Sequence, residues 1–228
     1  ATRTRELSTE QVPHVSPAEI YEKAKKQHDQ NLQRLLIVED NDELRNYLTH
    51  TLSDNYTIQT CSNGKEALTI VKEYMPELII SDIMMPEMRG DELCAAIKND
   101  IETSHIPIIL LTALNDEKNI LEGLKIGADE YIVKPFNIGI LKATIANLLT
   151  NRALLKSKYA NLEVSEEEEV SPNCATDLDW KFIATVKKSV EENIDNPAFN
   201  VDVLCNLLNM SRTSFYNKLK ALTDQAPA

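Results

Sequence analysis

The sequence predicts an α/β fold, a doubly wound five-stranded parallel sheet, followed by a smaller all-α segment. Three observations lead to this prediction. Short apolar runs rich in β-branched residues recur between residues 34 and 150, helical patterns alternate with these runs, and the pattern beyond residue 177 is purely helical. Uninterrupted apolar runs are typical of strands that are buried on both faces of a parallel sheet.

The apolar runs predict five strands. Four of them are continuous, and the run at 56–60 alternates in the way expected of an edge strand. The predicted strands are Leu35–Val38, Tyr56–Thr60, Leu78–Ile80, Ile106–Leu111 and Tyr131–Val133.

Five helical patterns lie between and after these strands, each with apolar residues spaced for one helix face. Strands that alternate with helices favour right-handed crossovers, which place helices on both faces of the sheet. The helical faces are Leu44/Tyr47/Leu48/Leu52, Ala67/Leu68/Val71/Met75, Leu93/Ala96/Ile97, Ile120/Leu121/Leu124 and Ile140/Leu141/Ile145/Leu148/Leu149, and the last helix is expected to continue through Arg152, Leu155 and Tyr159.

Charge and composition divide the chain into four segments. Residues 1–33 read as a partly helical linker, and residues 34–150 form the sheet domain, which carries ten basic and nineteen acidic side chains. Residues 151–176 read as a helix extension and an acidic linker, because the run of glutamates at 166–169 is followed by a proline. A specific acidic docking tail is the alternative reading of this run. Residues 177–228 form the helical segment.

Overall composition excludes several classes of protein. The 228 residues carry a net charge of −12 and are 43 % hydrophobic, which excludes a disordered chain, a collagen-like chain and a disulfide-framework miniprotein. The four cysteines form no CxxC pair, which argues against a zinc ribbon and fits a reducing compartment. We therefore expect a cytoplasmic location. Because the sequence does not begin with Met, we also expect a piece of a longer parent, which could be anchored in the inner membrane.

In the helical segment, two short helices are joined by a tight turn. Phe182, Val186, Val190 and Ile194 recur every four residues and predict one helix face. Asn200 is expected to cap a second helix and Ser211 a third. Two short helices joined by a turn are the outline of a helix-turn-helix. The predicted inner faces are Val203/Leu204/Leu207/Leu208 in the second helix and Phe215/Leu219/Leu222 in the third.

Polar residues end four of the five apolar runs. Glu39 and Asp40 follow the first strand, and Asp82, Thr112 and Lys134 follow the third, fourth and fifth. Ligands of open parallel sheets bind at the carboxyl ends of the strands. Each of these residues alone would more often be structural, but together at matching strand ends they indicate one site.

The types of residue at this site suggest its chemistry. Mg²⁺ prefers oxygen ligands, so Asp40 and Asp82 are candidates for direct coordination and Glu39 for a water-mediated contact. Asp82 could then act as a nucleophile that forms an acyl phosphate. Thr112 could donate a hydrogen bond to a phosphoryl oxygen, and Lys134 supplies a fixed positive charge.

These residues resemble the receiver domain of two-component response regulators, over about residues 33–150. The resemblance is carried by Leu35-Leu36-Ile37-Val38-Glu39-Asp40, Ser81-Asp82-Ile83-Met84-Met85-Pro86-Glu87-Met88-Arg89-Gly90, Leu111-Thr112-Ala113 and Tyr131-Ile132-Val133-Lys134-Pro135-Phe136. It implies a flavodoxin-like doubly wound five-stranded parallel sheet, a histidine kinase as phosphodonor, and slow self-dephosphorylation rather than enzymatic turnover.

The resemblance also implies a role for each site residue. Asp82 would be the phosphoacceptor, and the Mg²⁺ site would be completed by the backbone carbonyl of Met84. The switch residues would be Thr112 and Tyr131, with Lys134 as the phosphate partner and the Lys134-Pro135 peptide in cis. The acidic metal pair would be Glu39 and Asp40. The surface expected to change includes the helix at 115–126.

Residues 177–228 resemble the first helix-turn-helix of AraC-type transcription regulators. The resemblance is carried by Val203-Leu204-Cys205-Asn206-Leu207-Leu208-Asn209-Met210-Ser211-Arg212-Thr213-Ser214-Phe215-Tyr216-Asn217-Lys218-Leu219-Lys220. Asp224 stands where the family usually has Gly, and the family's second helix-turn-helix would follow Pro227. By position, Thr213, Tyr216 and Asn217 would face base edges, and Arg212 and Lys220 would lie near phosphates.

Together the two resemblances imply the C-terminal part of a hybrid two-component sensor and regulator, in which phosphorylation promotes a homodimer and switches DNA binding. A phosphotransfer or phosphate-sink module whose tail does not bind DNA is the alternative. An aspartyl-phosphate hydrolase is a third hypothesis, but such enzymes usually carry a second Asp two residues after the nucleophile, where this chain has Met84.

Overall fold

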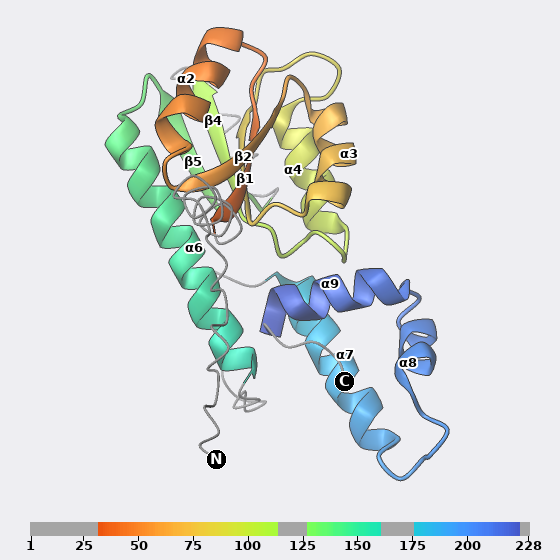
Figure 1. The fold of residues 1–228 in the computed structure, drawn as a ribbon. Coiled ribbons are helices and arrows are strands. Elements are labelled where there is room, and N and C mark those ends of the chain that lie inside the picture. Colours follow the sequence, from red (N-terminus) through yellow and green to blue (C-terminus); the bar gives the residue numbers. More distant parts are fainter. Residues whose placement is uncertain (1–31, 114–126, 161–175, 224–228) are drawn as a thin grey trace, which may run out of the picture. The chain divides into compact units, whose positions relative to one another are not determined.

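The structure, a computed structural model, describes residues 32–113, 127–160 and 176–223 (Figure 1). Within these ranges no helix combines the length and apolar character that crossing a bilayer requires. The predictions for residues 1–31, for the helix at 115–126 and for the acidic part of the linker lie outside the described residues.

The central sheet confirms the predicted fold class. Its five strands are parallel and follow the order β2-β1-β3-β4-β5, so the chain moves outward from β1 first to one edge of the sheet and then to the other. This reversal next to β1 places a topological switch point between β1 and β3. The strands are β1 (Gln33–Val38), β2 (Tyr56–Cys61), β3 (Leu78–Asp82), β4 (Ile108–Ala113) and β5 (Glu130–Lys134).

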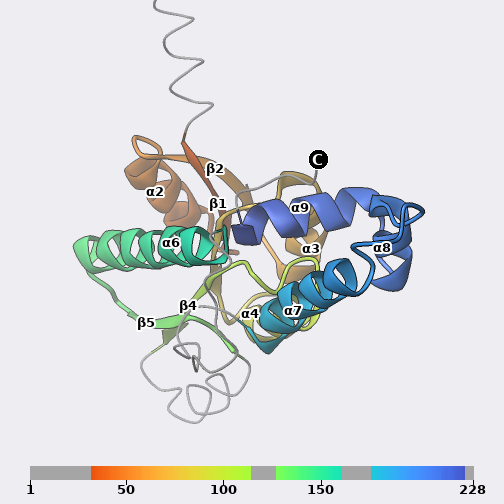
Figure 2. The same cartoon turned by 90° about the horizontal axis from the view of Figure 1, so that it is seen from below.

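Helices cover both faces of this sheet. The helices α2 (Asp42–Leu52) and α6 (Ile138–Ala160) lie on one face, and α3 (Gly64–Tyr74) and α4 (Gly90–Asn99) lie on the other (Figures 1 and 2). Alternate residues of each central strand therefore point into two separate apolar clusters, one on each face. Burial of both faces explains why the strands read as continuous apolar runs.

One element boundary differs from the sequence prediction, and another confirms the predicted extension of a helix. The fourth strand begins at Ile108 rather than Ile106, because Pro107 has no N–H with which to join the ladder. The last helix of the sheet domain continues to Ala160, as the apolar pattern through Arg152 and Leu155 predicts.

The C-terminal helices are α7 (Asp177–Glu192), α8 (Val201–Leu207) and α9 (Arg212–Thr223). The Asn200 side chain accepts hydrogen bonds from the backbone N–H of Asp202 and Val203, and the Ser211 hydroxyl accepts one from the N–H of Ser214. Both predicted caps are therefore present. Asn209, with φ of 53°, makes the tight turn between α8 and α9.

Part of the predicted helical core is exposed. In α7 Phe182 is buried, but Val190 is 43 % exposed and Ile194, beyond the end of the helix, is 78 % exposed. A spacing of four residues advances about 40° beyond a full turn each time, so this series rotates away from the core.

The short helix α8 also buries a narrower face than predicted. Leu204 is buried, whereas Val203 and Leu207 are exposed. Val203 and Leu207 each precede an inward-facing leucine by one position, which is about 100° around the helix.

Candidate functional site

The strand-end residues converge at one edge of the sheet. Glu39 follows β1, Asp82 and Lys134 are the last residues of β3 and β5, and Thr112 lies near the end of β4. Because all five strands are parallel, their carboxyl ends share this edge. The predicted convergence of these side chains depends on this arrangement.

Three carboxylates form a compact acidic cluster. Glu39, Asp40 and Asp82 each offer an oxygen, and these oxygens lie within 4.8 Å of one another. Two oxygens bound to one Mg²⁺ at about 2.1 Å are at most about 4.2 Å apart, so a small inward movement would satisfy one ion. Hard oxygen donors and this spacing therefore fit Mg²⁺. Glu39 and Asp82 are buried, whereas Asp40 is exposed and closes the cluster from the solvent side.

The ammonium group of Lys134 bridges two of these carboxylates. Its Nζ lies 2.8 Å from Oε2 of Glu39 and 3.0 Å from Oδ2 of Asp82. Burial by itself would lower the pKa of Lys134, but the hydrogen bonds to Glu39 and Asp82 outweigh it and raise that pKa. Lys134 is therefore held as a cation beside Asp82.

Backbone and side-chain contacts fix the orientation of the two buried acids. The backbone N–H of Ile83 donates to Oδ1 of Asp82 at 2.8 Å, which leaves Oδ2 directed toward Lys134. The guanidinium of Arg45 donates to the backbone carbonyl of Glu39 at 2.6 Å. Burial raises the pKa of Glu39, and the hydrogen bond from Lys134 offsets part of that increase.

Thr112 and Tyr131 lie on the neighbouring strands β4 and β5, where Thr112 pairs with Val133, the residue before Lys134. Among the described residues, the buried Thr112 hydroxyl donates only a long bond, 3.4 Å, to the backbone carbonyl of Ala113. Tyr131 packs against the core cluster on the α3 and α4 face, and its buried hydroxyl has no hydrogen-bond partner among the described residues. Burial raises the pKa of Tyr131 to about 12, so it is neutral. Their roles as a switch pair stay predictions.

The loop after β3 approaches the site closely. A Cβ atom added at Gly90 would lie 2.0 Å from the backbone carbonyl oxygen of Asp82, so only glycine fits where α4 begins. The backbone N–H of Gly90 donates to the carbonyl of Ile83 at 2.9 Å and ties the loop to the strand end. Met84, whose carbonyl is a predicted metal ligand, has a side chain that is 55 % exposed. The Lys134-Pro135 peptide is cis, as the resemblance implies.

The five candidate DNA-contact residues all lie on α9, but their surroundings differ. Arg212 pairs with Asp202 at 3.3 Å and lies over the ring of Tyr216, with 5.8 Å to the ring centroid. Thr213 is exposed. Asn217 and Lys220 instead line a cavity against the sheet domain.

Sequence reasoning missed two kinds of supporting residue. One is Arg45, whose guanidinium donates to the backbone carbonyl of Glu39. Its position in α2, six residues after Glu39, was the sequence signal that could have identified it. Gly90 lies within a quoted motif, but its reason is the close approach to Asp82, which only the fold reveals. The structure therefore brings the predicted residues at the strand ends together and adds Arg45 and Gly90, which support them.

Comparison with known families gives one match. Residues 35–146 match the response regulator receiver domain. In structure, the chain is similar to the signal receiver domain of a signal transduction histidine kinase from Syntrophus aciditrophicus, with a TM-score of 0.51 and 34 % identity; the match covers 61 % of this chain and 97 % of that chain.

Two curated relatives place this domain in longer proteins. The chain is 42 % identical over 193 residues to histidine kinase P4 from Formosa agariphila, a match that covers 85 % of this chain and 14 % of that protein. It is 39 % identical over 116 residues to the transcriptional regulatory protein AfsQ1 from Streptomyces coelicolor, which covers 50 % of each. The chain thus spans half or less of the length of both relatives.

Proposed function

The chain belongs to the response regulator family through its receiver domain, residues 35–146, and from this we propose that Asp82 accepts a phosphoryl group from a histidine kinase. The observation that carries the proposal is the position of Asp82 between two groups. One carboxylate oxygen is bonded to the backbone of Ile83, and the other faces Lys134 at 3.0 Å within the acidic cluster.

The proposed transfer is a displacement at phosphorus. A carboxylate oxygen of Asp82 forms the new O–P bond, and the N–P bond of the kinase phosphohistidine breaks. The bonding electron pair returns to the imidazole nitrogen, which then takes up a proton. Lys134 is placed to bind an oxygen of the phosphoryl group after transfer, because its ammonium already lies beside the reacting carboxylate.

Mg²⁺ is the cofactor that we propose for this site, held by Glu39, Asp40, Asp82 and the carbonyl of Met84. The ion would neutralise the charge that accumulates on the phosphoryl oxygens. Three oxygens within 4.8 Å support this assignment. In the part of the chain that the structure describes, the Thr112 hydroxyl makes only a long bond, to Ala113, so it would turn toward the phosphoryl group, and Tyr131 would follow it.

Intact mass spectrometry tests the phosphoacceptor proposal. We expect acetyl phosphate and Mg²⁺ to add one phosphoryl group to the wild type and none to Asp82→Asn. Asp54→Asn is the matched control, because Asp54 is an exposed aspartate of the same domain outside the site. Glu39→Gln and Asp40→Asn should weaken the dependence on Mg²⁺. A folded wild type without any adduct would contradict the proposal.

We further propose that α8 and α9 read DNA and that phosphorylation controls them, with an activated homodimer as the binding form. The capped helices, the Asn209 turn and a common apolar core around Phe215 support a helix-turn-helix. The AraC-type resemblance suggests contacts by Arg212, Thr213, Tyr216, Asn217 and Lys220.

The relatives make a hybrid kinase parent a further part of this proposal, because histidine kinase P4 is far longer than this chain. Loss of DNA binding by Tyr216→Ala or Asn217→Ala in the full-length protein would support the proposal that α9 reads DNA, and Asn206→Ala, at an exposed residue of α8, is the control. DNA binding that none of these changes affects would favour a contact elsewhere. Absence of DNA binding would favour a phosphate sink.

A further inference from the structure

A buried ionic cluster joins the helical segment to the receiver domain. Lys218 of α9 and Asp179 of α7 form a salt bridge, and both side chains are fully buried. The hydroxyl of Ser104, in the turn before β4, accepts from Nζ of Lys218 and donates to Oδ1 of Asp179, each at 2.9 Å. Nδ1 of His105 lies 3.5 Å from the same ammonium.

This cluster requires groups from both parts of the chain. A buried ion pair is costly unless further polar groups complete its coordination. Here the receiver domain supplies them through Ser104, His105 and Arg152, whose NH1 lies 4.0 Å from Oδ2 of Asp179. Ile101 of the receiver also packs against the apolar core of the helical segment. The contact is thus a polar interface with a specific geometry rather than a loose apolar one.

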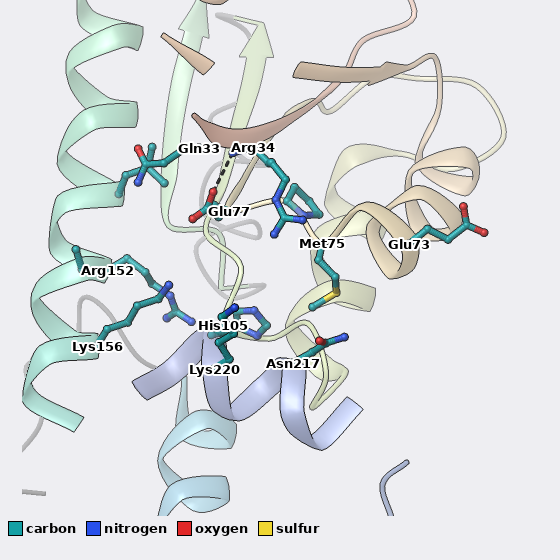
Figure 3. A pocket seen from close by; sticks show the side chains of 14 residues that line it. Gln33, Arg34, Glu73, Met75, Glu77, His105, Arg152, Lys156, Asn217 and Lys220 are labelled. Carbon is teal, nitrogen blue, oxygen red and sulfur yellow. Dashed lines mark hydrogen bonds between the residues drawn. The ribbon is translucent and has the colours of Figure 1, made fainter. Parts of the chain in front are cut away.

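The same contact turns one side of α9 toward the receiver domain. Asn217 and Lys220, on either side of Lys218 in sequence, line a cavity of about 470 Å³. Across the cavity lie Arg152 and Lys156 of α6 together with Glu77, the residue before β3 (Figure 3). A helix that reads bases must enter a major groove about 12 Å wide. The cavity leaves no room for a duplex on this side of α9.

The net charge of the receiver segment as a whole opposes the approach of DNA. The receiver segment, residues 34–150, carries ten basic and nineteen acidic side chains. The cavity itself is lined by basic side chains as well as acidic ones, namely Arg34, Arg152, Lys156 and Lys220 with Glu73 and Glu77. Exclusion of a duplex therefore rests on the lack of room, and the net negative charge acts only at long range.

We propose that Ser104, His105 and Arg152 form a docking surface for α7–α9 of the same chain, and that docking keeps double-stranded DNA away from α9. This inference rests on the proposed DNA-reading function and adds its regulation. DNA binding then requires release of the Ser104 bridge. The apparent affinity of α9 for DNA is its intrinsic affinity multiplied by the fraction of molecules that are released.

The test replaces Ser104 in the full 228-residue chain. Ser104→Trp introduces a side chain that is too large for a fully buried position, without adding charge that would itself attract DNA. Ser53→Trp is the matched control, because Ser53 is an exposed serine at the end of α2. Phosphorylation of Asp82 by acetyl phosphate, followed by intact mass, verifies that the receiver domain of each variant is folded.

Two quantities are measured for each protein. Small-angle X-ray scattering gives the radius of gyration, which should increase for Ser104→Trp and not for Ser53→Trp. Fluorescence anisotropy gives affinity for a labelled 150-bp duplex of mixed sequence at low salt. If about one molecule in ten is released in the wild type, release of all molecules raises this affinity about tenfold. Adding Asn217→Ala and Lys220→Ala to Ser104→Trp should remove the gain.

Three results would overturn the proposal, and they are distinguishable. An unchanged radius of gyration for Ser104→Trp would show that the Ser104 turn does not hold the helices. A larger radius with wild-type DNA affinity would show that docking does not block DNA, while DNA reading itself stands. A larger radius with no DNA binding by either protein would contradict the DNA-reading function as well.

Discussion

At the residue scale, the site is a balance between three carboxylates and one ammonium group. Glu39 and Asp82 are buried, and like charges this close repel one another unless a cation lies between them. Lys134 provides that cation at 2.8 and 3.0 Å. Lys134 therefore supplies the positive charge that offsets part of the repulsion between the buried acids.

Replacement of Lys134 tests this balance. We expect Lys134→Met to lower the free energy of unfolding without metal by about 1–2 kcal/mol, less than for a fully buried pair because the lysine is 24 % exposed. Mg²⁺ should restore more stability to the variant than to the wild type, because it replaces the missing positive charge. Urea unfolding with and without Mg²⁺ measures both effects. Lys65→Met, at a 77 % exposed lysine, is the control, and an equal response to Mg²⁺ would contradict the argument.

Tyr131 gives a second prediction at this scale. Its hydroxyl is buried without a partner among the described residues, so it has lost hydration without gaining a hydrogen bond. Tyr131→Phe should therefore be neutral or stabilising, by up to about 1 kcal/mol. Tyr56→Phe, at another half-buried tyrosine, serves as the comparison. If urea unfolding shows that Tyr131→Phe lowers the free energy of unfolding by more than about 1 kcal/mol, the Tyr131 hydroxyl is hydrogen-bonded and the argument is wrong.

At the scale of elements, the site depends on how strand ends connect to helices. The loop from β3 to α4 returns so closely that Gly90 lies against the backbone of Asp82. Asn41 caps α2 directly after Glu39 and Asp40, by accepting from the N–H of Leu44 at 2.9 Å. The functional acids are thus held by the first turns of the helices that follow them.

The glycine that begins α4 provides a test at this scale. Gly90→Ala would place Cβ 2.0 Å from a carbonyl oxygen, so we expect a loss of about 2 kcal/mol and slower phosphorylation of Asp82. Gly139→Ala in the first turn of α6 is the control, since its Cβ would approach only the Asn137 side chain at 3.0 Å. That change should be neutral or stabilising, because alanine is the better helix former. Thermal unfolding compares the two, and equal losses would contradict the prediction.

At the scale of the whole molecule, the receiver domain and the helical segment share one buried polar cluster. Ser104 and His105 belong to the turn that leads into β4, the strand that carries Thr112. The charged members Asp179 and Lys218 come from two other helices. The packing of α7 to α9 therefore depends on the receiver domain for part of its polar coordination.

His105 makes this dependence sensitive to pH. Burial lowers its pKa well below the usual value, and Lys218 of α9, Arg152 and Lys156 of α6 and Lys98 of α4 lower it further. In the unfolded chain the same imidazole binds a proton near pH 6.5. Stability is therefore unaffected above that pH and falls as the pH drops through it, by up to about 1.4 kcal/mol per unit.

Urea unfolding at pH 7.5 and 5.5 measures this effect. His105→Asn should reduce the difference in stability between the two pH values, whereas His50→Asn, at an exposed histidine, should not. Asp179 does not interfere, since its pKa is lowered from an ordinary value already below this range. The same pH dependence in His105→Asn and in the wild type would contradict the assignment.

The sequence by itself determined the sheet, its helices on both faces and the strand-end residues Glu39, Asp82 and Lys134. These follow from local periodicity and from the rule that parallel strands end at one edge, so neighbouring residues along the chain carry the information. The inner faces of α7 and α8 were predicted in part wrongly, because Val190 and Leu207 are spaced like core residues but rotate toward solvent.

Only the tertiary structure decided the remaining contacts. Ser104 and Lys218 are 114 positions apart, and neither lies in a periodic pattern that points to the other. A serine in a turn and a lysine on a helix read as ordinary surface residues. Their bridge to Asp179 exists because α6, α7 and α9 pack together and exclude water, and that energy depends on burial, which no local spacing encodes.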